Sequence, residues 1–234
     1  MFRLPWIKRE RQHIRVPQRL NRNGIPIREA GVEHTGQVLM EYATTLCGLP
    51  DLSSTNVLDV GCGTRFAATI TNRNIAIKSY TGIEVDRRVV KYLKRNFENR
   101  DRRFSFHYWD VYNEAYNKSG RKLSEYRSLP AKGSFDLIWL FSVFTHLVPS
   151  DAESMLHLLR GAVNGNGHLV FSAFVDESLD GFEDRVPEKP LHNAFYGGRL
   201  IRELIERNGW SIAADHPADM SRFIQHHFVC RPAR

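Results

Sequence analysis

The sequence has few cysteines and no long apolar run, and these absences exclude several classes of protein. Its three cysteines, Cys47, Cys62 and Cys230, are scattered and form no CxxC pair, so neither a disulfide framework nor a structural zinc site is indicated. The longest uncharged apolar stretches, such as 137–148, are much shorter than the roughly 20 residues of a membrane-spanning helix. The first residues lack the apolar core of a secretory signal, so we expect a cytoplasmic protein without a membrane span.

The positive charge is confined to one end of an otherwise ordinary composition. The chain has 234 residues, of which 42% are hydrophobic and 25% charged, as in a globular domain. Residues 1–28 carry eight Lys or Arg against the single acid Glu10, which equals the net charge of +7 of the whole chain. The other residues are neutral in sum. We therefore predict a basic N-terminal arm over 1–32 and one domain over 33–234.

Three interpretations of the arm stay open: a solvated tail, a lid over a ligand site, or a contact with an anionic partner such as acidic lipid, a phosphorylated acceptor or RNA. Pro5, Pro17 and Pro26 interrupt any long amphipathic helix there. Proteins that bind RNA carry more than one basic strip, so nucleic acid is not the expected partner.

Past the arm, buried strands alternate with longer helical patterns. The strands are expected over 57–60, 80–84, 104–109, 135–141, 167–174, 210–214 and 223–230, and the helices over 32–47, 66–72, 87–99, 151–163 and 198–208. Continuous apolar strands separated by helices predict an α/β fold with a mostly parallel sheet that is covered on both faces. In such a sheet the ligand binds beyond the carboxyl ends of the strands.

A glycine pair follows the first of these strands. Gly61 and Gly63 allow a tight turn and a close approach of the backbone to a ligand. Glu84 ends the next strand, 21 residues after Gly63, which is the spacing expected for an acid that holds ribose hydroxyls. Asp59 precedes the glycines, and an acid at that point suits a ligand with an ammonium group better than a pyrophosphate.

Four segments in this order, VLDVGCG, YTGIEVD, HYWDVYN and FDLIWLFSVFTHL, resemble class I S-adenosylmethionine-dependent methyltransferases. The resemblance covers about 33–230. It implies a Rossmann-like methyltransferase fold with a mostly parallel sheet of seven strands and helices on both faces, and S-adenosyl-L-methionine as the cofactor.

The resemblance also assigns nine positions to the cofactor. They are Asp59, Gly61 and Gly63 for the methionine part, Glu84 for the ribose hydroxyls, Val85 beside the adenine, Asp110 and Val111 at the adenine edge, and Leu140 and Phe141 beside the transferable methyl group. The family often has a third glycine where this chain has Arg65. Either the loop bends differently or Arg65 reaches toward an anionic group, and a solvent-facing arginine is the alternative.

The acceptor is specified less well than the cofactor. The stretch LFSVFTHL lacks the proline pair typical of enzymes that methylate nucleic-acid nitrogens, and it contains no nucleophilic cysteine. It does contain His146, whose usual pKa near 6.5 suits a base that takes the proton of an acceptor hydroxyl. The alternative is that His146 only begins a helix or caps a turn.

A long connection over 175–198 mixes carboxylates with aromatic side chains. The resemblance of SVFTHL to bacterial methyltransferases of sugars, glycolipids and secondary metabolites, together with this connection, points to O-methylation of a sugar or oligosaccharide. Asp176, Asn193 and Tyr196 are the expected substrate residues, and a solvated acidic loop is the alternative. We predict no metal site, although a divalent metal stays open because acids without fixed spacing do not specify one. The alternative functions are methylation of a lipid or secondary metabolite, RNA methylation, and cofactor binding without catalysis.

Overall fold

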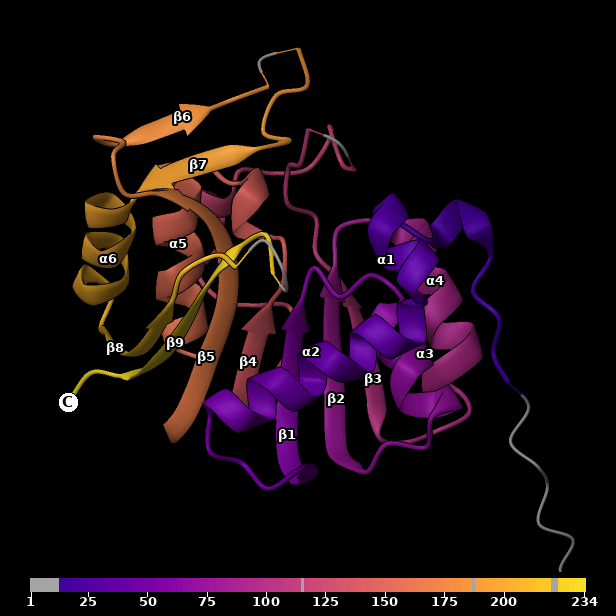
Figure 1. Cartoon of the computed structure of the whole chain (residues 1–234). Coiled ribbons are helices and arrows are strands. Elements are labelled where there is room, and N and C mark those ends of the chain that lie inside the picture. Colours follow the sequence, from indigo (N-terminus) through magenta and orange to yellow (C-terminus); the bar gives the residue numbers. More distant parts are fainter. Residues whose placement is uncertain (1–12, 115, 187, 220–222) are drawn as a thin grey trace, which may run out of the picture.

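The computed structural model describes residues 13–114, 116–186, 188–219 and 223–234, and within them the chain forms a mixed sheet of nine strands (Figure 1). The strands are β1 (Leu52–Val60), β2 (Ile77–Glu84), β3 (Phe104–Tyr108), β4 (Phe135–Leu140), β5 (Val163–Asp176), β6 (Phe182–Asp184), β7 (Ala194–Gly197), β8 (Trp210–His216) and β9 (His226–Pro232).

The centre of the sheet is parallel, as the alternation of strands and helices predicts. β3, β2, β1, β4 and β5 lie side by side in this order, and every pair among them is parallel. β9 pairs antiparallel with both β5 and β8, because the chain reverses between the last two strands. The predicted Rossmann-like fold with a mostly parallel core is thereby confirmed.

Helices cover both faces of the sheet. The helices are α1 (Ile25–Ala30), α2 (Val32–Leu46), α3 (Arg65–Asn72), α4 (Arg87–Leu93), α5 (Pro149–Arg160) and α6 (Gly198–Arg207), with a π-helical turn over Lys94–Glu98 and short 3-10 turns over Gln18–Leu20, Leu123–Glu125 and Phe144–His146. Apolar side chains of α2, α3 and α4 pack against one face, and those of α5 and α6 pack against the other. The sheet is therefore the middle layer of three.

Two strands go beyond the seven that the resemblance implies. β6 and β7 form a short antiparallel hairpin, and β7 pairs with the last three residues of β5, Phe174–Asp176. This hairpin occupies most of the connection expected between β5 and α6, and Figure 1 shows it above the carboxyl ends of β4 and β5.

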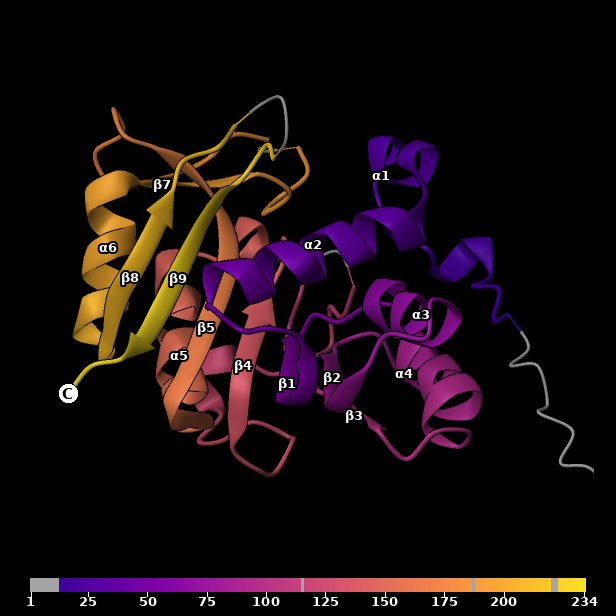
Figure 2. The same cartoon turned by 60° about the horizontal axis from the view of Figure 1, so that its bottom comes forward.

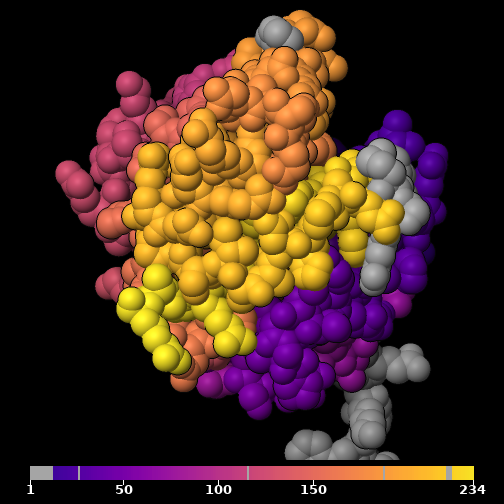
Figure 3. Space-filling model, turned by 60° about the vertical axis from the view of Figure 1, so that its left-hand side comes forward, coloured from indigo at the N-terminus to yellow at the C-terminus, as the bar shows by residue number. Residues whose placement is uncertain are grey.

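The N-terminal helix α2 packs against the C-terminal strands β8 and β9. Figure 2 shows α2 crossing the sheet close to β9, and in Figure 3 the C-terminal strands lie directly against the N-terminal helices. The Tyr42 ring of α2 contacts His216 of β8 and His227 of β9, at centroid distances of 6.3 and 5.3 Å. None of the helices in the described residues has the length and apolar character needed to cross a membrane.

Candidate functional site

A cavity of about 310 Å³ lies at the carboxyl ends of β1, β2 and β4, where the topology predicts a ligand. Eight of the predicted site residues line it. They are Asp59, Gly61, Gly63, Glu84, Val85, Val111, Phe141 and His146.

The glycine loop after β1 requires residues without a side chain. Gly61 and Gly63 have positive φ angles of 72° and 49°. A Cβ atom on Gly61 would lie 2.7 Å from a methyl carbon of Val143. The loop is also tied to β2, because the N–H of Gly61 and that of Cys62 both donate to the carbonyl of Ile83, at 2.9 and 3.1 Å.

The Glu84 carboxylate holds this loop and the start of α4 together. It accepts hydrogen bonds from the backbone N–H groups of Gly63 at 3.0 Å, Val85 at 2.8 Å and Asp86 at 3.1 Å. Burial raises the pKa of Glu84, while these three donors act in the opposite direction. The side chain is thus fixed at the edge of the cavity before any ligand arrives.

Asp59 is a second buried acid in the cavity. Only 2% of it is exposed, and burial raises its pKa to about 7 against the hydrogen bond that the Tyr80 hydroxyl donates to it. A carboxyl group in this state ionises readily when a cation binds beside it, because the cation favours the charged form. The pair of acids therefore fits a ligand that has both hydroxyl groups and an ammonium group.

Arg65, the residue in place of a third glycine, begins α3 and lines the cavity. Burial lowers the pKa of its guanidinium group, and the nearby charge of Asp59 opposes this effect. Its guanidinium carbon lies 5.1 Å from the centre of the Phe66 ring. Arg65 is therefore part of the cavity wall, and its expected contact with an anionic group stays a prediction.

His146 lies in the 3-10 turn after β4 and also faces the cavity. Its Nδ1 atom is 2.6 Å from the backbone carbonyl oxygen of Leu191. Since a carbonyl only accepts, Nδ1 carries the hydrogen, and Nε2 of the neutral ring keeps its lone pair. Burial lowers the pKa of His146 from its usual 6.5, which favours the neutral ring. The rings of Tyr116 and His192 flank it, with centroids at 6.4 and 6.0 Å.

Two of the positions expected beside the cofactor do not line the cavity. Leu140 is fully buried in the core, and its neighbour Phe141 is the one that faces the cavity. The carboxylate of Asp110 accepts hydrogen bonds from the Tyr108 hydroxyl at 2.5 Å and from the Asn117 amide at 3.1 Å, which lower its pKa. Asp110 therefore organises the loop after β3.

The three expected substrate residues also lie away from the cavity lining. Asp176 pairs with Arg185 and accepts from the Ser178 hydroxyl. Tyr196 is fully buried, and its hydroxyl donates to the backbone carbonyl of Leu147 at 2.6 Å. Asn193 belongs to the loop before β7, where its carbonyl accepts from the backbone N–H of Arg185 at 3.2 Å.

Other acids of the 175–198 connection are likewise neutralised. Glu177 pairs with Arg202, and Asp180 pairs with Arg199. The connection reaches the site through a backbone group, the carbonyl of Leu191, and through the His192 ring. An interpretation from composition cannot distinguish these roles, because Arg185 within the connection and Arg199 and Arg202 beyond it decide which carboxylates are paired.

Several residues of the cavity have no signal in the motifs. Arg22, Asn23, Gly24 and Ile27 come from the N-terminal segment, and Tyr116 comes from the loop after β3. Tyr112 and Asn113 also line the cavity; they end the segment HYWDVYN, but the resemblance gave them no role. The basic character of the arm pointed to a lid as one of its three interpretations, and its described part does border the cavity. Among the described residues, no group of three or more His, Cys, Asp or Glu side chains is placed to hold a metal ion.

The comparisons with known proteins agree with this geometry. Residues 58–169 match the family model described as a methyltransferase domain. The matched segment includes both acids, both glycines, the loop after β3, β4 and His146. The chain therefore contains a class I S-adenosylmethionine-dependent methyltransferase domain, and the protein is a methyltransferase that uses this cofactor.

Solved structures share the fold at low sequence identity. Magnesium protoporphyrin IX methyltransferase of Synechocystis, with bound S-adenosylhomocysteine, is 14% identical, with a TM-score of 0.58 over 90% of this chain and 89% of the other. A 1,6-didemethyltoxoflavin N1-methyltransferase of Burkholderia thailandensis is 13% identical, with a TM-score of 0.58 over 90% and 82%. An O-methyltransferase of neocarzinostatin biosynthesis, in complex with a hydroxy-methyl-naphthoic acid, is 16% identical, with a TM-score of 0.54 over 89% and 58%.

Proposed function

We propose that the protein transfers a methyl group from S-adenosylmethionine to a hydroxyl group of a small natural-product acceptor, with His146 as the general base. The observation that carries this proposal is the state of His146. Its Nδ1–H is held by the Leu191 carbonyl at 2.6 Å, which leaves the Nε2 lone pair as the acceptor of a proton in a ring that lines the cavity.

The division of work follows from the chemistry of the transfer. S-adenosylmethionine supplies an already electrophilic methyl group, so the protein has to place the acceptor in line and remove its proton. Glu84 and Asp59 bind the polar ends of the cofactor, and the glycine loop lets the backbone approach it. His146 takes the hydroxyl proton on Nε2, and the resulting imidazolium is stabilised by the Leu191 carbonyl. A base in this position contributes roughly 10²–10⁴ in rate.

The surroundings of His146 favour a ring-bearing acceptor over a saccharide. Tyr116 and His192 present flat faces and edges beside it, whereas the carboxylates expected to bind sugar hydroxyls are paired with arginines. The ligands bound in two structural neighbours, a hydroxy-methyl-naphthoic acid and 1,6-didemethyltoxoflavin, are also compact ring systems. These findings support methylation of a secondary metabolite better than methylation of a sugar.

The test uses a panel of phenols, hydroxylated heteroaromatics and sugars, with formation of S-adenosylhomocysteine as the readout. With the best acceptor, His146→Ala should lower turnover at least a hundredfold and leave cofactor affinity within a few-fold. Turnover of the wild type should rise with pH through a pKa below 6.5 and then level off, because only the neutral ring accepts a proton. The variant should lose this acidic limb.

The matched control is His157→Ala, which removes an exposed histidine of α5. It should leave both turnover and the pH profile unchanged. If His146→Ala keeps a near-normal rate and the same acidic limb, another group takes the proton and the proposal is wrong. Turnover with sugars alone would restore the saccharide hypothesis.

A further inference from the structure

The N-terminal segment is anchored on the body of the domain before it reaches the cavity. Ile14 exchanges two backbone hydrogen bonds with the Asn72 side chain at the end of α3, at 2.9 and 3.0 Å, and Leu20 is buried. Past this anchor the chain turns to the cavity, where Arg22 and its neighbours form part of the wall. The segment that carries Arg22 is therefore anchored to the domain directly before it reaches the cavity.

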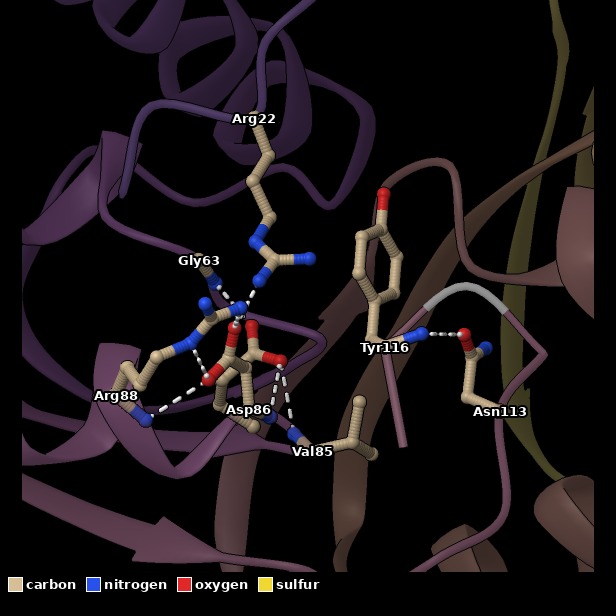
Figure 4. Close-up of polar contacts among 8 residues, drawn as sticks. Arg22, Gly63, Val85, Asp86, Arg88, Asn113 and Tyr116 are labelled. Carbon is tan, nitrogen blue, oxygen red and sulfur yellow. Dashed lines mark hydrogen bonds and ion pairs between the residues drawn. The ribbon is translucent and has the colours of Figure 1, made fainter. Parts of the chain in front are cut away.

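Arg22 joins two parts of the domain that are distant in sequence (Figure 4). Its guanidinium group forms an ion pair with Asp86, which also caps the N-terminus of α4. Its guanidinium carbon lies 4.0 Å from the centre of the Tyr116 ring, in the loop after β3. An arginine that spans an acid on one wall and an aromatic ring on the other closes the space between them.

One donor of Arg22 is left over in this arrangement. Within the described residues, its Nε atom is buried and has no hydrogen-bond partner. A buried N–H without an acceptor costs about 1–3 kcal/mol. Because Arg22 lines the cavity beside Glu84, a ligand oxygen there would satisfy this donor.

The size of the cavity indicates that part of its wall moves when ligands bind. A volume of about 310 Å³ is at the lower end for small-molecule sites, and this one has to admit a cofactor and an acceptor. The wall formed by Arg22, Asn23, Gly24 and Ile27 is the part of the lining that comes from the N-terminal segment, outside the strands and their following loops. Movement of this wall would open the cavity without disturbing the sheet.

We propose that Arg22 is a cofactor-contacting residue that also closes the pocket: its Nε–H donates to the cofactor at the Glu84 end, while Asp86 and the Tyr116 ring hold the segment shut. The cofactor enters and the product S-adenosylhomocysteine leaves when the contacts of Arg22 with Asp86 and Tyr116 break. The basic arm thereby contributes a binding residue and sets the lifetime of the complex. The proposal concerns only the cofactor and does not depend on the acceptor or on His146.

The experiment measures binding of S-adenosylhomocysteine to the full-length protein, by calorimetry for affinity and by stopped-flow intrinsic fluorescence for the dissociation rate. Trp109 lines the cavity and is the expected reporter. Arg22→Ala should weaken binding at least tenfold, mostly through faster dissociation. Arg22→Lys keeps the charge but loses the Nε donor and the planar group, and it should recover only part of the affinity.

Two controls distinguish the effect of the Arg22 contacts from a general effect of charge or folding. Arg19→Ala removes the same charge from an exposed position three residues earlier, and it should bind like the wild type. Tyr116→Phe keeps the ring, so S-adenosylhomocysteine should dissociate from it slowly. From Tyr116→Ala the ligand should dissociate several times faster. Melting curves of the ligand-free variants show whether each has folded.

Unchanged affinity and dissociation rate in folded Arg22→Ala would overturn the proposal. An equal loss of affinity in Arg19→Ala would also overturn it, since the effect would then come from the charge of the arm alone. If Arg22→Ala does not fold, Arg22→Lys and the pair of Tyr116 variants decide the question by their dissociation rates. Failure of the proposed O-methylation would show in turnover with acceptors and would leave these binding results unaffected.

Discussion

Replacement of Glu84 by glutamine separates the binding role of this residue from its structural role. In the structure the carboxylate accepts three backbone N–H groups, from Gly63, Val85 and Asp86, and its remaining acceptor capacity faces the cavity. Glu84→Gln keeps the length of the side chain and one carbonyl oxygen, and it removes the charge and one acceptor. We expect affinity for S-adenosylhomocysteine to fall much more than stability does.

The magnitudes follow from the bonds lost. Hydrogen bonds from ribose hydroxyls to a charged acceptor contribute about 1.5–3 kcal/mol each, and bonds to a neutral acceptor about 0.5–1.5 kcal/mol. Loss of one bond and weakening of the other amounts to about 2–4 kcal/mol, or on the order of a hundredfold in the dissociation constant. In the ligand-free protein one backbone bond is lost, and this loss is offset because burial already disfavours the charged form and raises the pKa of Glu84. A net change of about 1 kcal/mol or less corresponds to about 2–4 °C in melting temperature for a chain of this length.

Calorimetric titration with S-adenosylhomocysteine and melting of the ligand-free protein test both parts. The control is Glu206→Gln, the same change at an exposed position of α6, which should alter neither quantity. Unchanged affinity in Glu84→Gln would refute the assignment of the ribose hydroxyls to this carboxylate. A fall in melting temperature of more than about 8 °C would show that the loss of affinity is a consequence of unfolding in the glycine loop.

Three further predictions follow from the cavity. Cofactor affinity should rise with pH and level off above about 7, because Asp59 is protonated below its pKa of about 7 and must ionise beside a cationic ligand. Calorimetry across this pH range should show proton release on binding, and the affinity of Asp59→Asn should not change with pH. Gly61→Ala should abolish detectable cofactor binding and lower the melting temperature, because φ is 72° there and a Cβ would lie 2.7 Å from a Val143 methyl carbon; an intact titration curve would contradict this. Asp176→Asn should change turnover less than threefold, because Asp176 is paired with Arg185 away from the cavity. A tenfold or larger rise in the KM for the acceptor would show that Asp176 does bind the substrate.

The parallel core could be predicted because each of its strands is marked locally. β1 and β4 contain runs of buried apolar residues, and each is followed by a turn or a helix signal. The hairpin of β6 and β7 could not be predicted in this way, since its strands have three and four residues and are partly polar. Their existence depends on pairing with the end of β5, which is a tertiary contact.

The residues of the candidate site also differ in whether the local sequence indicates them or only the folded structure does. Asp59 and Glu84 lie at the carboxyl ends of β1 and β2, and Gly61 directly follows β1. All three belong to a spaced motif, so sequence indicates them directly. The partner of His146 is a backbone carbonyl 45 residues away, and a carbonyl has no signature in the side chains. The acid that binds Arg22 is 64 residues away from it, so only the folded structure brings the two together.

The double pairing of β5 separates the edge of the sheet that borders the cavity from the hairpin at the end of this strand. The body of this strand is held between β4 and β9, and its last three residues carry the hairpin. The hairpin can therefore be replaced as a unit between the end of β5 and α6, while the carboxyl ends of β1, β2 and β4 stay in place. Such a graft must bring one backbone carbonyl to the position of Leu191, because the tautomer of His146 depends on it. None of the described residues of this connection lines the cavity, so its replacement would act on His146 through the Leu191 carbonyl and the His192 ring.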